Sequence, residues 1–155
     1  MIGSLYAIAV ADDQISAITT MIEVTAASTS VTLIERLSCT QSDTNASENC
    51  AVTLQRVTTT GTYTDSAFIP PPFQATSAAF GGTVKTKSTI TPTYTASKIL
   101  IESGFNILSG FLWTPASDDE IVVLGPSTLI GFELSTVGAG AITFCYGMTI
   151  REIGA

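Results

Sequence analysis

Apolar and polar residues alternate along most of this chain, which is the pattern of β-strands that bury one face. The clearest run covers 142–151, where every second residue is apolar: Ile142, Phe144, Tyr146, Met148 and Ile150. The same pattern, cut by Gly, Pro, Asn and Asp, predicts further strands at 5–10, 17–25, 29–41, 50–59, 83–89, 99–107, 111–113, 120–124 and 128–136. No segment sustains a helical period. We therefore expect one all-β domain over 1–155, an antiparallel, jelly-roll-like β-sandwich of about 8–10 strands.

The polar segment 42–48 separates two of the strongest strand signals and predicts a β-hairpin between 29–41 and 50–59. In a hairpin centred on that segment, Cys39 and Cys50 stand opposite each other, within reach of a disulfide. Two reduced thiols in contact are the alternative, which a reducing compartment favours.

Few side chains offer catalytic or metal-binding chemistry. Glu35 and Arg56 interrupt apolar faces of the predicted hairpin, which favours a structural ion pair over a catalytic carboxylate. The acidic cluster 118–120 could offer oxygens to Ca²⁺, but it lacks the alternating acids and the glycine of an EF-hand and is typical of a solvated loop. Cys145 has no histidine partner anywhere in the chain, so a Cys–His nucleophile is excluded within one subunit.

Composition narrows the function classes. Only 12% of residues are charged, His is absent, and 6 bases against 13 acids leave a net charge of −7. Without a basic surplus the chain is not expected to bind nucleic acid, and without His most enzyme mechanisms and zinc sites are disfavoured. The apolar runs are far shorter than the ~20 residues of a membrane span. The first ten residues lack a basic signal-peptide start, so we expect synthesis in a cytoplasm. With no metal-ligand pattern in the sequence, we also expect no cofactor.

Apolar side chains gather in and beside predicted loops. The segment 60–97 is a loop-rich excursion with three consecutive prolines, which cannot donate to a sheet ladder, and residues 1–16 could form an N-terminal arm. Loop-borne apolar surface of this extent is typical of a protein that another subunit or protein covers. The candidate interface residues are Phe68, Ile69, Pro70, Pro71, Pro72, Phe73, Phe111, Leu112 and Trp113.

Four stretches together carry a family resemblance. They are Leu5-Tyr6-Ala7-Ile8; Thr32-Leu33-Ile34-Glu35-Arg36-Leu37 followed by Thr40-Gln41-Ser42; 102–113 (ESGFNILSGFLW) followed by Pro115 and 119–123 (DEIVV); and 148–154 (MTIREIG). In these stretches the sequence resembles small head decoration (cement) proteins of tailed bacteriophages. The segment 60–97 is not matched.

The resemblance implies a non-enzymatic structural protein of a virion, made in the host cytoplasm. It implies an oligomerising β-sandwich that binds and stabilises the outer face of the major capsid lattice. We expect a homo-oligomer, with a trimer favoured over a dimer.

Two other functions stay open at this stage. The first is a binding module, such as a phage tail-fibre tip or a carbohydrate-binding jelly roll, in which Trp113 near Asp118 and Asp119 would form a sugar platform. The second is a hydrolase that uses the carboxylates of 118–120. It ranks last, because catalytic carboxylates normally converge from separate parts of a chain.

Overall fold

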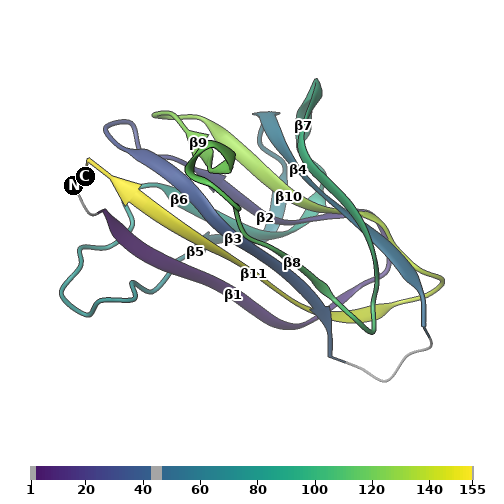
Figure 1. Cartoon of the computed structure of the whole chain (residues 1–155). Coiled ribbons are helices and arrows are strands. Elements are labelled where there is room, and N and C mark those ends of the chain that lie inside the picture. Colours follow the sequence, from purple (N-terminus) through teal and green to yellow (C-terminus); the bar gives the residue numbers. More distant parts are fainter. Residues whose placement is uncertain (1–2, 43–46, 155) are drawn as a thin grey trace.

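A computed structural model describes residues 3–42 and 47–154 of the chain and shows an all-β sandwich (Figure 1). Sheet A consists of β1 (Ser4–Ile15), β11 (Ile142–Ile153) and β3 (Val31–Gln41), with β8 (Phe111–Trp113) and β9 (Val122–Leu124) both paired to β3. Sheet B consists of β5 (Thr62–Phe68), β6 (Thr83–Ile90), β2 (Thr19–Thr25), β10 (Leu129–Thr136), β4 (Asn49–Thr59) and β7 (Thr93–Asn106). Among the described residues one 3-10 turn, η1 (Asp118–Glu120), interrupts the strands.

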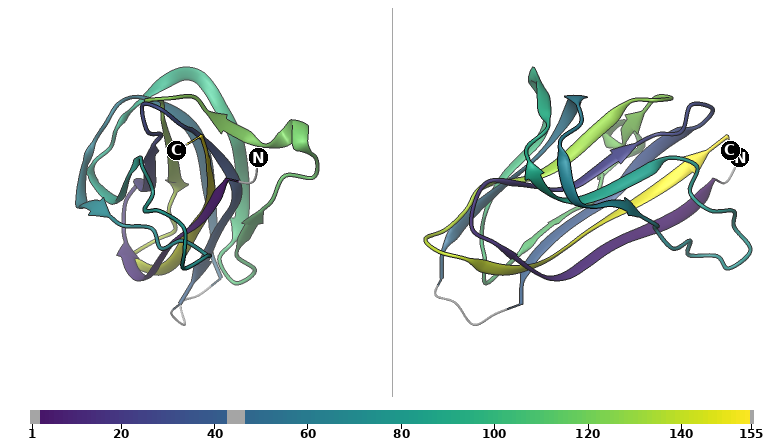
Figure 2. Two further views of the ribbon diagram at one scale, coloured as in Figure 1. Left: turned by 90° about the vertical axis from the view of Figure 1, so that its left-hand side faces the viewer. Right: turned by 180° about the vertical axis from the view of Figure 1, so that it is seen from behind.

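The strand order confirms the predicted jelly-roll-like sandwich. The first four strands alternate between the sheets, β1 and β3 in sheet A and β2 and β4 in sheet B, and the last two strands, β10 and β11, do the same. As a result β11 lies beside β1, and β10 lies beside β2. An end-on view shows the two sheets facing each other around the core (Figure 2). Each sheet thus buries one apolar face against the other.

The core is built from the alternating strands. Every second residue of β11 is buried, as the sequence predicts, including Phe144, Met148 and Ile150. The rings of Phe111 and Phe132 lie 6.1 Å apart, so the short strand β8 also contributes to the core.

The predicted hairpin between 29–41 and 50–59 is wrong, although both strands exist. β3 pairs with β11 in sheet A, whereas β4 pairs with β10 and β7 in sheet B. Their apolar faces meet across the core and not side by side. Seven residues, 42–48, connect β3 to β4, and 43–46 lie outside the described residues. A connection of this length can cross the ~10 Å between two packed sheets.

A β-bulge in β3 explains why Glu35 breaks the predicted alternation. Ile34 pairs with Ile150 and Arg36 with Thr149, so Glu35 is the extra residue on its strand. The bulge moves the inward face from even positions, such as Ile34, to odd positions, such as Leu37. Val31 and Leu33 therefore do not share a face with Leu37 and Cys39, contrary to the prediction.

The two segments considered as an arm and an excursion are largely strands. Residues 4–15 of the segment 1–16 form β1, which pairs with β11 from Ser4 to Ile15. Within 60–97, β5 and β6 extend sheet B, and the residues without regular strand structure are concentrated in 69–82. This loop lies at the end of the sandwich where both chain ends lie (Figure 1).

Candidate functional site on the outer face of sheet A

The proline-containing loop runs along the free edge of β1. The Ala7 amide donates to the Pro71 carbonyl (3.0 Å), and the Phe73 amide donates to the Leu5 carbonyl (2.8 Å). Pro72 forms an isolated bridge with the buried Tyr6, and Pro70 is buried. Ile69 and Phe73 are 80% and 61% exposed, and Pro71 is also exposed. The extended backbone therefore turns alternate residues of 69–73 inward and outward.

In the second predicted interface segment, β8, exposed and buried side chains also alternate. Leu112 is 62% exposed, whereas Phe111 is only 8% exposed and packs against Phe105 and Phe132. The prediction that Phe111 is an interface residue is therefore wrong, because strand alternation places it in the core. Trp113 is half-buried and packs against the core, as does Phe68.

These exposed side chains lie along two opposite edges of one sheet face. Leu112 pairs with Ser38 on β3, and the exposed Val123 of β9 pairs with Leu33. Across the sheet, Phe73 lies beside Leu5 at the edge of β1. The outer face of sheet A is thus bordered by large apolar side chains on both sides.

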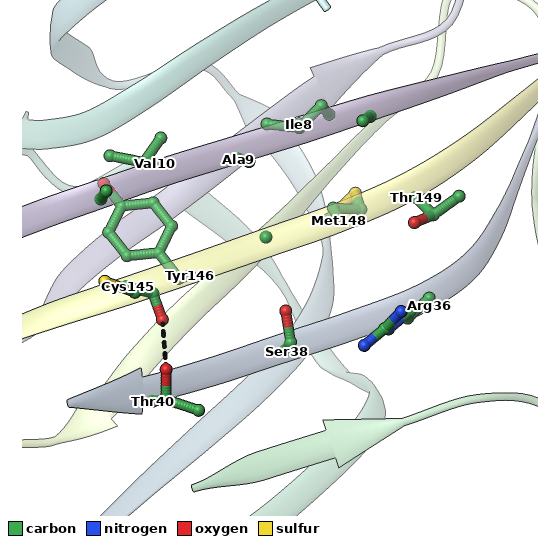
Figure 3. Close-up of a pocket in the computed structure, with 13 residues that line it drawn as sticks. Ile8, Ala9, Val10, Arg36, Ser38, Thr40, Cys145, Tyr146, Met148 and Thr149 are labelled. Carbon is green, nitrogen blue, oxygen red and sulfur yellow. Dashed lines mark hydrogen bonds between the residues drawn. The ribbon is translucent and has the colours of Figure 1, made fainter. Parts of the chain in front are cut away.

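Small side chains make the centre of this face hollow. The outward positions of β1, β11 and β3 carry Ala7, Ala9, Cys145, Gly147, Thr149, Ser38 and Thr40, which line a depression of about 510 Å³ (Figure 3). The Thr40 hydroxyl donates to the Cys145 carbonyl (3.4 Å). A Cβ at Gly147 would lie 2.9 Å from the Ile8 carbonyl oxygen, so the backbones of β1 and β11 leave no room for a larger residue there.

Charge on this face is limited. Arg36 lines the hollow, and beside it Glu35 forms a two-point ion pair with Arg151 of β11, in which Arg151 Nη2 donates to Glu35 Oε2 at 3.2 Å. The hydrogen bond to Glu35 raises the pKa of Arg151. The predicted Glu35–Arg56 pair is wrong, because the two residues belong to different sheets. Arg56 instead donates to the Val123 carbonyl (2.8 Å).

Two buried carboxylates lie on the other side of the molecule, over sheet B. Glu23 accepts hydrogen bonds from Tyr63 (2.7 Å) and Thr60 (2.6 Å), and Lys85 lies 3.5 Å away. Burial raises the pKa of the Tyr63 hydroxyl, and the Glu23 carboxylate reinforces this. This group is not among the predicted site residues; its one signal in the sequence is an acid within the otherwise uncharged strand 19–25.

Glu133 is the second buried carboxylate, and together with Glu23 and their hydrogen-bond partners it forms a buried polar layer over sheet B. Gln55 donates to it at 3.4 Å, and burial raises the pKa of its carboxyl group. Above it, the hydroxyl groups of Tyr94 and Thr20 are 2.5 Å apart. The strands that carry Tyr63 and Tyr94 are the two edges of sheet B, so the layer ties both edges to its centre.

Other carboxylates anchor loops and edges. Glu152 is buried and accepts hydrogen bonds from Ser30 (2.7 Å) and the Gly81 amide (3.1 Å). Asp13 pairs with Lys87 and accepts a hydrogen bond from Tyr146 (2.7 Å). These acids therefore have structural partners.

The structure also shows the positions of the three cysteines and of the acidic cluster 118–120. Cys39, Cys50 and Cys145 are free thiols, with Cys39 and Cys50 buried on opposite sheets. The 118–120 cluster forms η1, where Glu120 accepts a hydrogen bond from the Ala116 amide (3.0 Å). Within 3–42 and 47–154, no group of three or more Cys, Asp or Glu side chains could hold a metal ion.

Comparison of the chain with protein-family models, with curated proteins and with solved structures gives no match. Among the described residues there is no helix with the length and apolar character needed to span a membrane.

Proposed function

We propose that this chain is a non-enzymatic structural protein of a phage virion, a decoration protein that binds and stabilises the outer face of the major capsid lattice. The residues that resemble phage cement proteins support this proposal. The jelly-roll sandwich is compatible with it, because this fold recurs in viral capsid proteins, although it also recurs in lectins.

The observation that carries the proposal is the outer face of sheet A. Three long strands, β1, β11 and β3, form this face. The loop segment 71–73 lies beside β1, and the short strands β8 and β9 lie beside β3 at different positions along it, giving a width of about 20 Å where 71–73 and β9 flank the long strands. β1 and β11 have 12 residues each and are therefore about 40 Å long, so the face offers an extended surface to a partner protein. Exposed Phe73 and Leu112 at its borders are the anchors that we expect to bury in the capsid protein.

The chemistry of this face also favours binding over catalysis. Its hollow is lined by alanine, glycine and hydroxyl side chains, which lose little conformational freedom when a partner covers them. The buried acids Glu23, Glu133 and Glu152 belong to networks elsewhere in the fold.

The net charge of −7 suits an outward-facing capsid protein, since it does not compete for the packaged DNA. We further propose a homo-oligomer, with a trimer favoured, and light scattering of the purified protein measures the subunit number.

Co-sedimentation with capsids of the phage that encodes the chain tests the proposal. The double variant Phe73→Ser/Leu112→Ser is expected to bind at least about tenfold more weakly while keeping the wild-type circular dichroism spectrum. Ile90→Ser is the matched control, because Ile90 is 65% exposed but belongs to sheet B. Wild-type protein that fails to bind these capsids would refute the decoration function. Wild-type binding by the double variant would refute the assignment of this face.

A further inference from the structure

A separate hollow of about 510 Å³ opens where the edge of sheet A meets sheet B. Val123 of β9 forms one wall, and Val57 of β4 and Leu129 of β10 form the other. Its size lies within the range of small-molecule sites. It shares no lining residue with the hollow on the outer face of sheet A, although Val123 also borders that face.

Arg56 places a positive charge in this pocket. It pairs with the core residue Ile130 and continues the inward face of β4, so its side chain extends the core to the rim of the sandwich. Its Nη2 atom donates to the Val123 carbonyl oxygen at 2.8 Å. This bond holds the guanidinium across the gap between the sheets.

In the part of the chain that the structure describes, no carboxylate lines the pocket. The ion pairs found among the described residues involve Lys85, Lys87 and Arg151, and Arg56 is not in any of them. Half-buried Arg56, on a chain with a net charge of −7, is thus a local positive site with no ion-pair partner among the described residues. Desolvating a charge is costly unless an opposite charge accompanies it.

Further polar side chains surround the same space. Lys98 and Thr95 reach it from β7, and Ser127 and Thr128 reach it from the turn between β9 and β10. Ser127 has a left-handed backbone (φ 58°), and Thr128 donates from its hydroxyl to the Gly125 carbonyl at 2.7 Å. These contacts define the turn and keep its hydroxyl groups at the pocket.

We infer that this pocket binds a carboxylate group attached to a short apolar chain. The fork of Arg56 matches the two oxygens of a carboxylate, and Lys98 adds a second positive charge. The valine and leucine residues that line the hollow offer contacts to an alkyl group, which inorganic phosphate lacks. The carboxylate belongs either to a free organic acid or to an acidic residue of a protein segment. This inference does not depend on the decoration function.

Titration of the ¹⁵N-labelled full chain with hexanoate, followed by ¹H–¹⁵N NMR, tests the inference. Saturable shifts of the Arg56, Ser127 and Leu129 amides are expected, together with weaker binding of the neutral amide hexanamide and of inorganic phosphate. A blocked peptide, N-acetyl-Val-Asp-Val-amide, distinguishes the two sources. Binding of the peptide at least as tightly as hexanoate assigns the site to a protein segment, and tighter binding of hexanoate assigns it to a free acid.

Variants locate the site. Arg56→Gln is expected to weaken hexanoate binding by about tenfold or more, and Arg56→Lys, which keeps the charge and loses the fork, by less. Arg36→Gln removes the same charge on the outer face of sheet A and is expected to leave hexanoate affinity unchanged. A well-dispersed spectrum confirms that each variant is folded. Equal effects of Arg56→Gln and Arg36→Gln, shifts that never saturate, or phosphate binding more tightly than hexanoate would each overturn the inference.

Discussion

Gly131 lies directly beneath the ring of Tyr94, and a Cβ atom at this glycine would fall 2.9 Å from Tyr94 Cε1. Gly131 belongs to the central strand β10, and Tyr94 belongs to the edge strand β7. The missing side chain allows the tyrosine to fold over sheet B and reach Thr20 on β2. The buried polar layer therefore depends on this glycine for space rather than for backbone freedom.

Gly131→Ala is expected to lower the free energy of unfolding by about 1–3 kcal/mol, because the added methyl group must displace the Tyr94 ring. Urea unfolding measures the change. Gly104→Ala is the control, since a Cβ there meets only the Cys50 carbonyl oxygen, at 3.8 Å. If Gly131→Ala is as stable as wild type, the close contact does not limit this position. In a variant that already carries Tyr94→Ala, Gly131→Ala should lower the free energy of unfolding by less, because the ring that the new methyl group would meet is gone.

Glu133 is expected to make stability depend on pH. Burial raises the pKa of its carboxyl group, so the folded protein binds this proton more tightly than the unfolded chain. The stabilisation from this proton is present at low pH and is lost as pH rises through the folded pKa. Glu133→Gln keeps this position neutral. As pH rises above 4.5, the ordinary pKa of a glutamate, wild type should therefore lose stability relative to Glu133→Gln, as measured by urea unfolding at each pH. Parallel curves for the two proteins would contradict this assignment.

The thiols are expected to differ in reactivity. Burial raises the pKa of Cys39 to about 12, so almost no thiolate exists at neutral pH, and Cys50 is also buried with a raised pKa. Cys145 is half-buried on the outer face of sheet A. Under native conditions a thiol reagent such as DTNB should therefore modify Cys145 only, and all the thiols should react in guanidinium. Cys145→Ser should abolish the native reaction. Fast native labelling of that variant, or incomplete labelling after unfolding, would show that the thiols are arranged differently.

Tyr6 is expected to hold the loop 69–82 against β1. Its hydroxyl donates to the Ala78 carbonyl at 2.9 Å, and its ring lies 5.4 Å from that of Phe80. Tyr6→Phe keeps the ring contact and removes the hydrogen bond, at a cost of about 1 kcal/mol. Hydrogen exchange should become several-fold faster at the Phe73 amide, which bonds to the Leu5 carbonyl.

Tyr146→Phe is the matched control for this prediction. It removes the hydroxyl that bonds to Asp13, which lies away from the loop on the opposite half of β1. The Phe73 amide should then exchange as in wild type. Equal acceleration in both variants would mean that Tyr6 acts through global stability and not through the loop.

The local alternation of apolar and polar residues was enough to predict most of the strands and, in the regular ones, which side chains face inward; β5 and the first half of β7 were not predicted. In β11 the alternating apolar positions were sufficient, because a strand turns successive side chains to opposite faces whatever its neighbours are. The all-β class and the sandwich followed from the same local property repeated along the chain. Exposure of Ile69, Phe73 and Leu112 also agreed with their expected places at the surface.

Tertiary structure decided which strands are neighbours. Backbone hydrogen bonds between strands are formed alike by most residues, so the sequence of β3 and β4 does not reveal that each pairs with a distant strand. That choice separated Glu35 from Arg56, brought Glu35 to Arg151 through a bulge, and left Arg56 at the open rim between the sheets. It also buried Phe111 and enclosed Glu23 and Glu133 beneath the edges of sheet B, because burial depends on what packs above a residue and not on the residue itself.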